Sequence, residues 1–256
     1  MLGDCRGLLN YATAVGERAQ QLRRGDVGVL KVAATPLHIE SVFSQFLHRF
    51  AQRYPNVQVN VTEGSGLEIL AMLERGEIHL GQMLPYAVPL DDGRFGSQPL
   101  EPVVLLAASH PPLTLGIRGA IEVDRLAPYP LLLVDRGFGL RRAFDAACRL
   151  AGLKPTIRFE SRSPHTILAL AEAGHGVAVI ASTFSTHRYD LNITRLTYRG
   201  RPLREPLAVL WDKRRPLPRY ATAFCEMWAE HVREVFPITR PPGPKTDAKI
   251  KRASAR

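Results

Sequence analysis

The sequence has no long apolar run and few cysteines. Because a helix needs about 20 consecutive apolar residues to cross a bilayer, and no apolar run among the 256 residues approaches that length, the sequence excludes a transmembrane helix. The opening MLGDCR lacks the basic start and apolar stretch of a secretory signal, so we expect a cytoplasmic protein. The three cysteines, Cys5, Cys148 and Cys225, are scattered and lack metal-ligand spacing. This pattern is typical of reduced thiols and predicts neither a disulfide nor a metal site.

Motifs of catalysis are also missing. The sequence contains no nucleophile elbow, no P-loop and no dinucleotide fingerprint, and its eight histidines are dispersed along the chain. We therefore expect no catalytic residue and no cofactor, and we interpret the chain as a binding protein and not as an enzyme.

Half of the formal charge of +10 falls near one end of the chain. Residues 240–256 hold six basic residues and one acidic residue, and the same segment contains three prolines. Such a composition predicts a disordered, solvated tail. A weak electrostatic contact with phosphates is the alternative that the charge leaves open.

The stretch VGVLKVAATPLHIESVFSQFLHRF, residues 27–50, joins a strand to a helix. Its first half is an almost continuous apolar run, which predicts a strand buried on both faces. From Ile39, apolar residues recur every three or four positions, as in an amphipathic helix. Ligands bind beyond the carboxyl ends of strands in open α/β sheets, so residues 35–38 form a candidate binding segment. The alternative is that Thr35 caps the helix and Pro36 starts it, without any ligand.

Residues 8–22 carry the spacing of a coiled-coil seam. Apolar side chains recur at alternating steps of four and three residues, at Leu8, Ala12, Val15, Ala19 and Leu22. Two arginines and a glycine follow at residues 23–25, as expected where a helix ends. We therefore predict a separate linker or dimerisation helix over residues 1–24.

Strand and helix patterns alternate along the rest of the chain. The predicted strands cover residues 57–61, 78–83, 103–108, 131–134, 156–159, 177–181, 193–198 and 206–211, and the predicted helices cover 67–73, 140–150, 166–173 and 220–235, with a loop over 84–102 that is rich in proline and glycine. This order predicts an α/β fold with two similar lobes in series. Within a body over residues 25–239, we place lobe I at about residues 26–104 plus 206–239 and lobe II at about 105–205.

Five segments in register carry a resemblance to a known family. They are RRGDVGVLKVAATP, FLHRFAQRYPNVQVNVTEG, LAMLERGEIHLG, SHPPL and LALAEAGHGVAVIAS. Their order and approximate spacing resemble those of the effector-binding domain of LysR-type transcriptional regulators, over most of the chain. The resemblance implies two Rossmann-like lobes of the type 2 periplasmic-binding-protein fold. Residues 8–24 resemble the linker helix that joins this domain to an N-terminal winged helix-turn-helix, which is absent from the sequence.

The resemblance implies a ligand sensor for transcription. In the family, a small effector sits between the lobes and DNA is bound through the helix-turn-helix domain, so we expect a homodimer or homotetramer that binds DNA only through that absent domain. Hydroxyls, helix N-termini and arginines near the effector favour a carboxylate. The effector residues implied are Thr35, Pro36, Leu37, His38, Ser65, Met83, Arg136, Phe138, Ser163 and His165. A solute-binding protein of a transport system is the competing function, and it needs an export signal.

Arg136 and a further residue, His79, each have an alternative interpretation. Arg136 is the preferred charge partner of the effector, and a solvated surface arginine is its alternative. His79 stands where the family usually has an acidic residue; it suits a pocket base, but a neutral, hydrogen-bonded histidine is the commoner outcome in a buried strand.

Overall fold

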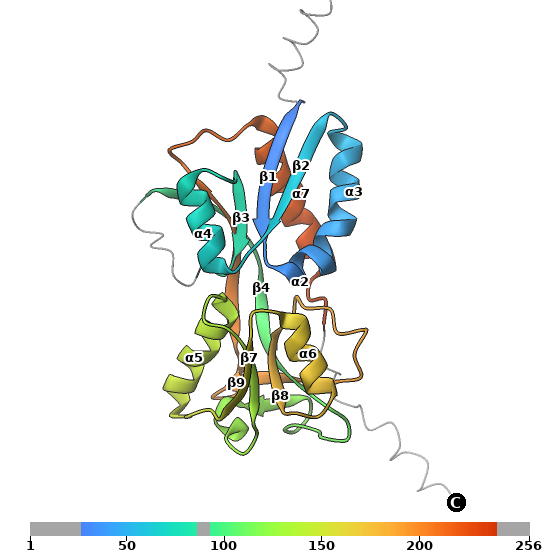
Figure 1. Cartoon of the computed structure of the whole chain (residues 1–256), viewed down its shortest axis with the longest axis vertical. Helices are drawn as coiled ribbons and strands as arrows, with labels where there is room; N and C mark the ends of the chain where they lie inside the picture. The colour runs from blue at the N-terminus through green and yellow to red at the C-terminus, as the bar shows by residue number, and fades with distance from the viewer. Residues whose placement is uncertain (1–26, 86–92, 240–256) are drawn as a thin grey trace, which may run out of the picture. The chain divides into compact units, whose positions relative to one another are not determined.

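The computed structural model describes residues 27–85 and 93–239, which form two units (Figure 1). Unit 1 comprises the described residues up to Glu101 together with Leu207–Val235, and unit 2 comprises Pro102–Pro206 with the described residues from Phe236. The predicted dimerisation helix and the predicted basic tail lie outside the described residues. None of the described helices is long and apolar enough to cross a membrane.

Unit 1 is built on a sheet with the strand order β2-β1-β3-β11-β4. The strands are β1 (Gly28–Ala34), β2 (Val57–Glu63), β3 (Leu80–Met83), β11 (Arg204–Asp212) and the first half of β4 (Phe95–Ser109). β1 pairs in parallel with β2 and with β3, whereas β11 runs antiparallel to β3. The carboxyl ends of β1, β2 and β3 therefore meet at one edge of the sheet.

Helices cover both faces of this sheet (Figure 1). They are α4 (Gly66–Arg75) on one face and α2 (Pro36–His38), the π-helical turn η1 (Ile39–Phe43), α3 (Ser44–Arg53) and α7 (Arg219–Val235) on the other. On the first face, Gly81 allows close packing, because a Cβ there would lie 2.5 Å from the Ile69 side chain. On the second face, the ring centroids of Phe43 and Phe46 lie 4.4 and 4.8 Å from that of Trp228. This aromatic layer fixes α7 against the helices that follow β1.

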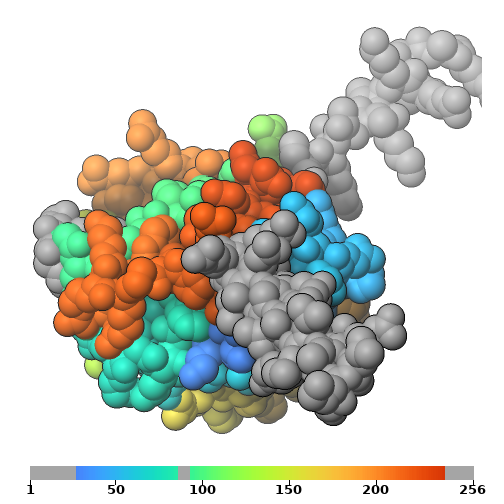
Figure 2. Space-filling view, turned by 90° about the horizontal axis from the view of Figure 1, so that it is seen from above, coloured from blue at the N-terminus to red at the C-terminus, as the bar shows by residue number. Residues whose placement is uncertain are grey.

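The segment after β11 lies against the end of α4 (Figure 2). The Arg215 guanidinium donates to the Leu73 carbonyl at 3.1 Å and to the Glu74 carbonyl at 3.2 Å. It also donates to the buried Asp212 carboxylate at 2.9 Å. Because these carbonyls belong to the last turn of α4, Arg215 supplies donors that a helix C-terminus otherwise lacks.

Unit 2 is built on a sheet with the strand order β4-β8-β6-β7. Its elements are the second half of β4, β5 (Ala120–Glu122), the 3₁₀ turn η3 (Val123–Leu126), β6 (Leu131–Val134), α5 (Gly139–Ala151), β7 (Ile157–Ser161), α6 (Pro164–Glu172), β8 (Val177–Ala181), β9 (Asn192–Tyr198), β10 (Arg201–Pro202) and the start of β11. β6 pairs in parallel with β7 and β8, and β4 runs antiparallel to β8 and β9. The carboxyl ends of β6, β7 and β8 therefore form a second edge, where loops lead from β6 into α5 and from β7 into α6.

Two of the boundaries that differ from the sequence prediction involve proline. β4 begins at Phe95, inside the segment predicted as a loop. Proline suggested a loop, but Pro99 lies in the part of β4 whose neighbour in unit 1 is β11 alone, and an edge strand tolerates a missing N–H. The apolar period begins at Ile39, but the first helix begins at Pro36, which confirms the alternative in which Pro36 starts the helix.

Residues 236–239 also differ from the prediction, which placed them in lobe I. The Thr239 N–H donates to the Ser182 carbonyl at 2.9 Å, and the Thr239 hydroxyl donates to the Phe184 carbonyl at 2.5 Å. These bonds fix the segment after α7 to unit 2.

Candidate ligand-binding site

The candidate residues of unit 1 follow the carboxyl ends of adjacent parallel strands. Thr35 follows β1, Ser65 follows β2 and precedes α4, and Met83 ends β3. A hydrogen bond of 3.2 Å from the Gly64 N–H to the Ala34 carbonyl fixes the loops after β1 and β2 side by side. Thr35 and Ser65 therefore lie at the same edge, as the strand-to-helix pattern predicts.

Thr35 and His38 form a hydrogen-bonded pair. Thr35 Oγ1 lies 2.9 Å from His38 Nδ1. Thr35 occupies the N-cap position of α2 but its side chain makes no capping bond, so the interpretation of its hydroxyl as a helix cap is wrong. His38 is buried, and burial lowers its pKa to about 4, so the imidazole is neutral at physiological pH. Thr35 and His38 thus form a polar but uncharged pair directly after β1.

Ser65 and Met83 have structural roles. The Ser65 N–H donates to the Glu68 carboxylate at 2.8 Å, and the Ser65 hydroxyl accepts from the Glu68 N–H at 3.5 Å. This reciprocal capping box starts α4. The Met83 side chain is buried in a core cluster with Phe95 and Leu210. What this edge offers a ligand therefore comes chiefly from residues 35–38.

The candidate residues of unit 2 also follow parallel strands. Residues 135–138 follow β6, and Ser163 follows β7 and precedes α6. The Asp135 N–H donates to the Ser161 carbonyl at 3.1 Å, and the Asp135 carboxylate accepts from the Gly137 N–H at 2.8 Å. These bonds shape the turn that carries Arg136.

Arg136 is an exposed cation beside a helix N-terminus. It stands three residues before the first residue of α5, and among residues 27–85 and 93–239 its guanidinium has no ion-pair partner. Phe138, at the N-cap position of α5, is buried and provides no side-chain cap. The first amide groups of α5 carry a partial positive charge, which adds to that of Arg136. Positive charge from the Arg136 side chain and from the start of α5 therefore lies beside this turn of unit 2.

Ser163 and His165 stand at the start of α6. Ser163 Oγ accepts a hydrogen bond from the Thr166 N–H at 3.4 Å, so Ser163 caps the helix. His165 Nδ1 lies 3.2 Å from the Tyr189 hydroxyl, a partner that the sequence did not reveal. A polar cluster thus accompanies the N-terminus of α6.

Arg141 is the main residue that the sequence analysis missed. Its side chain is 2% exposed, and its guanidinium donates to Asp145 at 3.0 Å, to the Val134 carbonyl at 3.0 Å and to Glu160. These bonds join α5 to the carboxyl end of β6 and to β7. The sequence could have revealed Arg141, because it is a charged residue on an otherwise apolar helical stripe, between Leu140 and Phe144.

His79, Cys148 and Cys225 have the neutral, structural character that was expected, and Cys5 lies outside the described residues. His79 Nδ1 accepts a hydrogen bond of 3.1 Å from the Lys31 N–H, and burial lowers the pKa of His79. Cys148 and Cys225 are free and buried, and burial raises the pKa of each thiol to about 12. In the part of the chain that the structure describes, no three His, Cys, Asp or Glu side chains come together in a way that holds a metal ion.

Comparison with known proteins points to regulators of transcription. The family model of the LysR substrate binding domain matches residues 23–233. An uncharacterized HTH-type transcriptional regulator, YcgK of Bacillus subtilis, is 28% identical over 213 residues, which are 76% of this chain and 64% of YcgK. The HTH-type transcriptional regulator CysB of Haemophilus influenzae is 27% identical over 187 residues, which are 73% of this chain and 57% of CysB. The chain thus spans less than two thirds of the length of either relative.

Solved structures share the fold. HinK, a LysR family transcriptional regulator from Pseudomonas aeruginosa, superposes with a TM-score of 0.70 at 19% identity, covering 89% of this chain and 78% of HinK. The effector binding domain of QuiR in complex with shikimate superposes with a TM-score of 0.71 at 13% identity, covering 81% of this chain and 98% of that domain.

Proposed function

The chain belongs to the LysR substrate-binding domain family, and from this premise we propose that it senses a small anionic effector for a transcriptional regulator. Its α/β architecture is the type 2 periplasmic-binding-protein fold that the resemblance implied. The observation that carries the proposal is Arg136, an exposed guanidinium without an ion pair among the described residues, directly before the N-terminus of α5. A carboxylate accepts hydrogen bonds from both.

The neutral pair of Thr35 and His38 supports an effector that also carries hydroxyl groups. The Thr35 hydroxyl and the uncharged His38 imidazole bond to each other and add no net charge. Neutral donors and acceptors discriminate hydroxyl patterns better than they discriminate charge. A hydroxylated carboxylate of the class represented by shikimate, the ligand in the QuiR structure, combines both features.

DNA binding and self-association complete the proposal. The regulators it resembles are of the HTH type, so we infer that sequence-specific DNA contact in the cytoplasm comes from a helix-turn-helix domain, which is not among the described elements. Among the described strands, β2 and β7 end their sheets, and each has one edge without a described partner. Open edges and the predicted seam over residues 8–22 both favour a homodimer or homotetramer.

A ligand screen with matched pairs tests the proposed effector class. Small carboxylates, shikimate included, are compared with their methyl esters by thermal denaturation of the protein. A ligand that binds only the folded state raises Tm as its concentration exceeds Kd. We expect at least one acid to raise Tm while its ester does not. Equal stabilisation by acid and ester would contradict an anionic effector, and no stabilisation by any compound would contradict the carboxylate class.

A further inference from the structure

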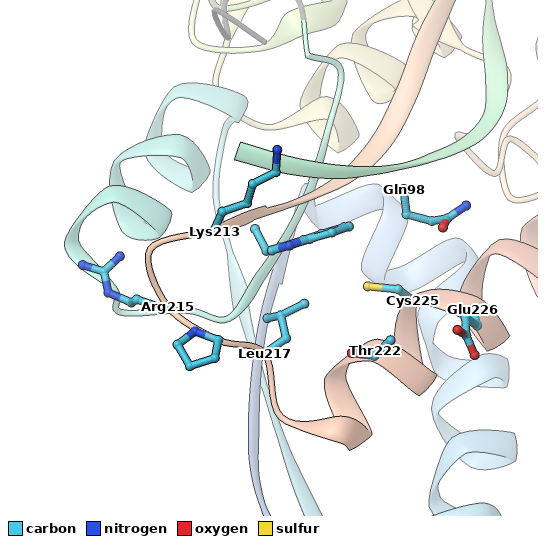
Figure 3. Close-up of a pocket in the computed structure, with 9 residues that line it drawn as sticks. Gln98, Lys213, Arg215, Leu217, Thr222, Cys225 and Glu226 are labelled. Carbon is cyan, nitrogen blue, oxygen red and sulfur yellow. The ribbon is translucent and has the colours of Figure 1, made fainter. Parts of the chain in front are cut away.

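Unit 1 contains a pocket of about 360 Å³ between β11, the edge strand β4 and α7 (Figure 3). Its lining residues include Trp211, Lys213, Leu217, Thr222, Cys225 and Glu226. Its volume is in the range of small-molecule sites, and its mixture of apolar residues with a few polar groups is typical of them.

The pocket lies at the opposite edge of the sheet from the candidate ligand-binding site. β11 is antiparallel to β3, with Ala208 opposite Met83 and Leu210 opposite Gly81. The end of β11 and the segment after it therefore lie at the amino end of β3, whereas Thr35 and Ser65 follow carboxyl ends. A strand rises about 3.3 Å per residue, so the seven residues of β1 separate the two edges by roughly 20 Å. A ligand in this pocket does not touch residues 35–38.

Glycine at position 96 allows the indole of Trp211 to form one wall. A Cβ on Gly96 would overlap the Trp211 ring, so the indole lies directly on the backbone of β4. Leu217 and the Cys225 thiol also line the pocket (Figure 3). Burial raises the pKa of Cys225 to about 12, so this wall is uncharged. These side chains can make apolar contacts with the aromatic or aliphatic part of a ligand.

The charged residues that line the pocket differ in whether they already have a partner within the protein. Arg215 is engaged by Asp212 and by two carbonyls of α4, so it fixes the segment after β11. Lys213 and Glu226 are both exposed, and neither has an ion-pair partner within residues 27–85 and 93–239. Lys213 follows β11 and Glu226 belongs to α7, so an unpaired cation and an unpaired anion lie on separate walls (Figure 3).

We propose that this pocket binds a small zwitterion with an apolar middle, whose carboxylate faces Lys213, whose ammonium faces Glu226 and whose body contacts Trp211. The site is independent of the proposed effector site, since the two lie at opposite edges of one sheet. Addition of a peptide strand to β4 does not fit as well, because Pro99 and Pro102 remove the N–H groups that such a strand needs.

Four probes, each built on a benzene ring, separate the contributions of the two ligand charges. 4-(Aminomethyl)benzoate carries both charges, benzoate and benzylamine carry one each, and benzyl alcohol carries none. Binding is followed by isothermal titration calorimetry and by Trp fluorescence. We expect 4-(aminomethyl)benzoate to bind in the millimolar range usual for so small a ligand. Because exposed ion pairs are weak, Lys213→Gln and Glu226→Gln should each raise the Kd of this probe two- to fivefold.

The single-charge probes and the controls make the test specific. Benzoate should respond to Lys213→Gln only, and benzylamine to Glu226→Gln only. Glu230→Gln, four residues further along α7 and also exposed, should change nothing. Thr222→Trp should fill the pocket and abolish binding, because Thr222 is an exposed lining residue whose enlargement leaves the core intact. The proposal is overturned if no probe binds saturably, if binding survives Thr222→Trp, or if both charge variants bind the zwitterion as the unchanged protein does.

Discussion

Thr35 and His38 are joined by a hydrogen bond of 2.9 Å between Thr35 Oγ1 and His38 Nδ1, directly after the carboxyl end of β1. The bond links the first residue after the strand to the last residue of α2. Burial of the imidazole lowers its pKa to about 4 from an ordinary value of 6.5. The candidate segment of unit 1 is therefore built around a histidine that is neutral above about pH 4 in the folded protein.

This histidine makes the stability of unit 1 depend on pH. Between pH 6.5 and 4, His38 binds a proton in the unfolded chain but not in the folded one, so the free energy of unfolding falls as the pH is lowered. The pKa difference corresponds to a loss of about 3 kcal/mol, complete near pH 4. His38→Asn removes the titration while keeping a polar side chain, and its stability should vary less with pH.

Fluorescence is suited to this measurement because Trp211 and Trp228, the two tryptophans of the chain, both lie in unit 1. Urea unfolding is followed at several pH values for both proteins. His79 and His231, whose pKa values burial also lowers, remain in the variant and set the baseline. Parallel curves of stability against pH would contradict a buried, neutral His38.

Sequence patterns predicted the buried parallel strands best. The predicted strands over 131–134 and 177–181 coincide with β6 and β8, because strands buried on both faces read as unbroken apolar runs. The first half of β4 was missed, since its partly exposed residues and its prolines carry no such run. The strand-to-helix joints were also predicted, and with them the edges where Thr35, Ser65 and Arg136 lie.

Sequence patterns could not predict the hydrogen-bond partners of the site residues. The contact of His165 with Tyr189 spans 24 residues, and that of Arg141 with Glu160 spans 19. Periodicity reports which face of an element is apolar, but not which polar groups another element brings to it. The Ser65 capping box could be recognised in the sequence, because its Ser and Glu stand three positions apart before an apolar helix.

Arg141 should be important for the stability of unit 2. Arg141→Met removes the donor to Asp145, Glu160 and the Val134 carbonyl. Both carboxylates remain partly exposed and can be hydrated, so we expect the free energy of unfolding to fall by about 2 kcal/mol, less than for a fully buried pair. Urea unfolding followed by circular dichroism measures the change. Arg149→Met, an exposed position on the same helix, is the control, and equal losses in the two variants would contradict this role for Arg141.

Effector affinity should depend on Arg136 and Thr35 without a loss of folding. Arg136→Ala removes a charged donor, so Kd should rise about tenfold, and Thr35→Ala should raise it several-fold through loss of one neutral bond. Calorimetric titration of an acid identified by the ligand screen gives both values. Arg149→Ala, at the other end of α5, should leave Kd unchanged. Unchanged affinity in both the Arg136 and Thr35 variants would contradict the assignment of these residues to the effector.

Self-association should depend on the predicted seam at residues 8–22. Val15 is a central position of that seam, so Val15→Glu would bury a carboxylate between paired helices, which is unfavourable without a counter-charge. We expect sedimentation velocity to show a shift from oligomer to a smaller species. Gln21→Glu adds the same charge to the same segment but away from the seam positions, so its oligomer should persist. If Val15→Glu leaves the oligomer intact, association must come from the α/β body, where the open edges of β2 and β7 become the surfaces to alter next.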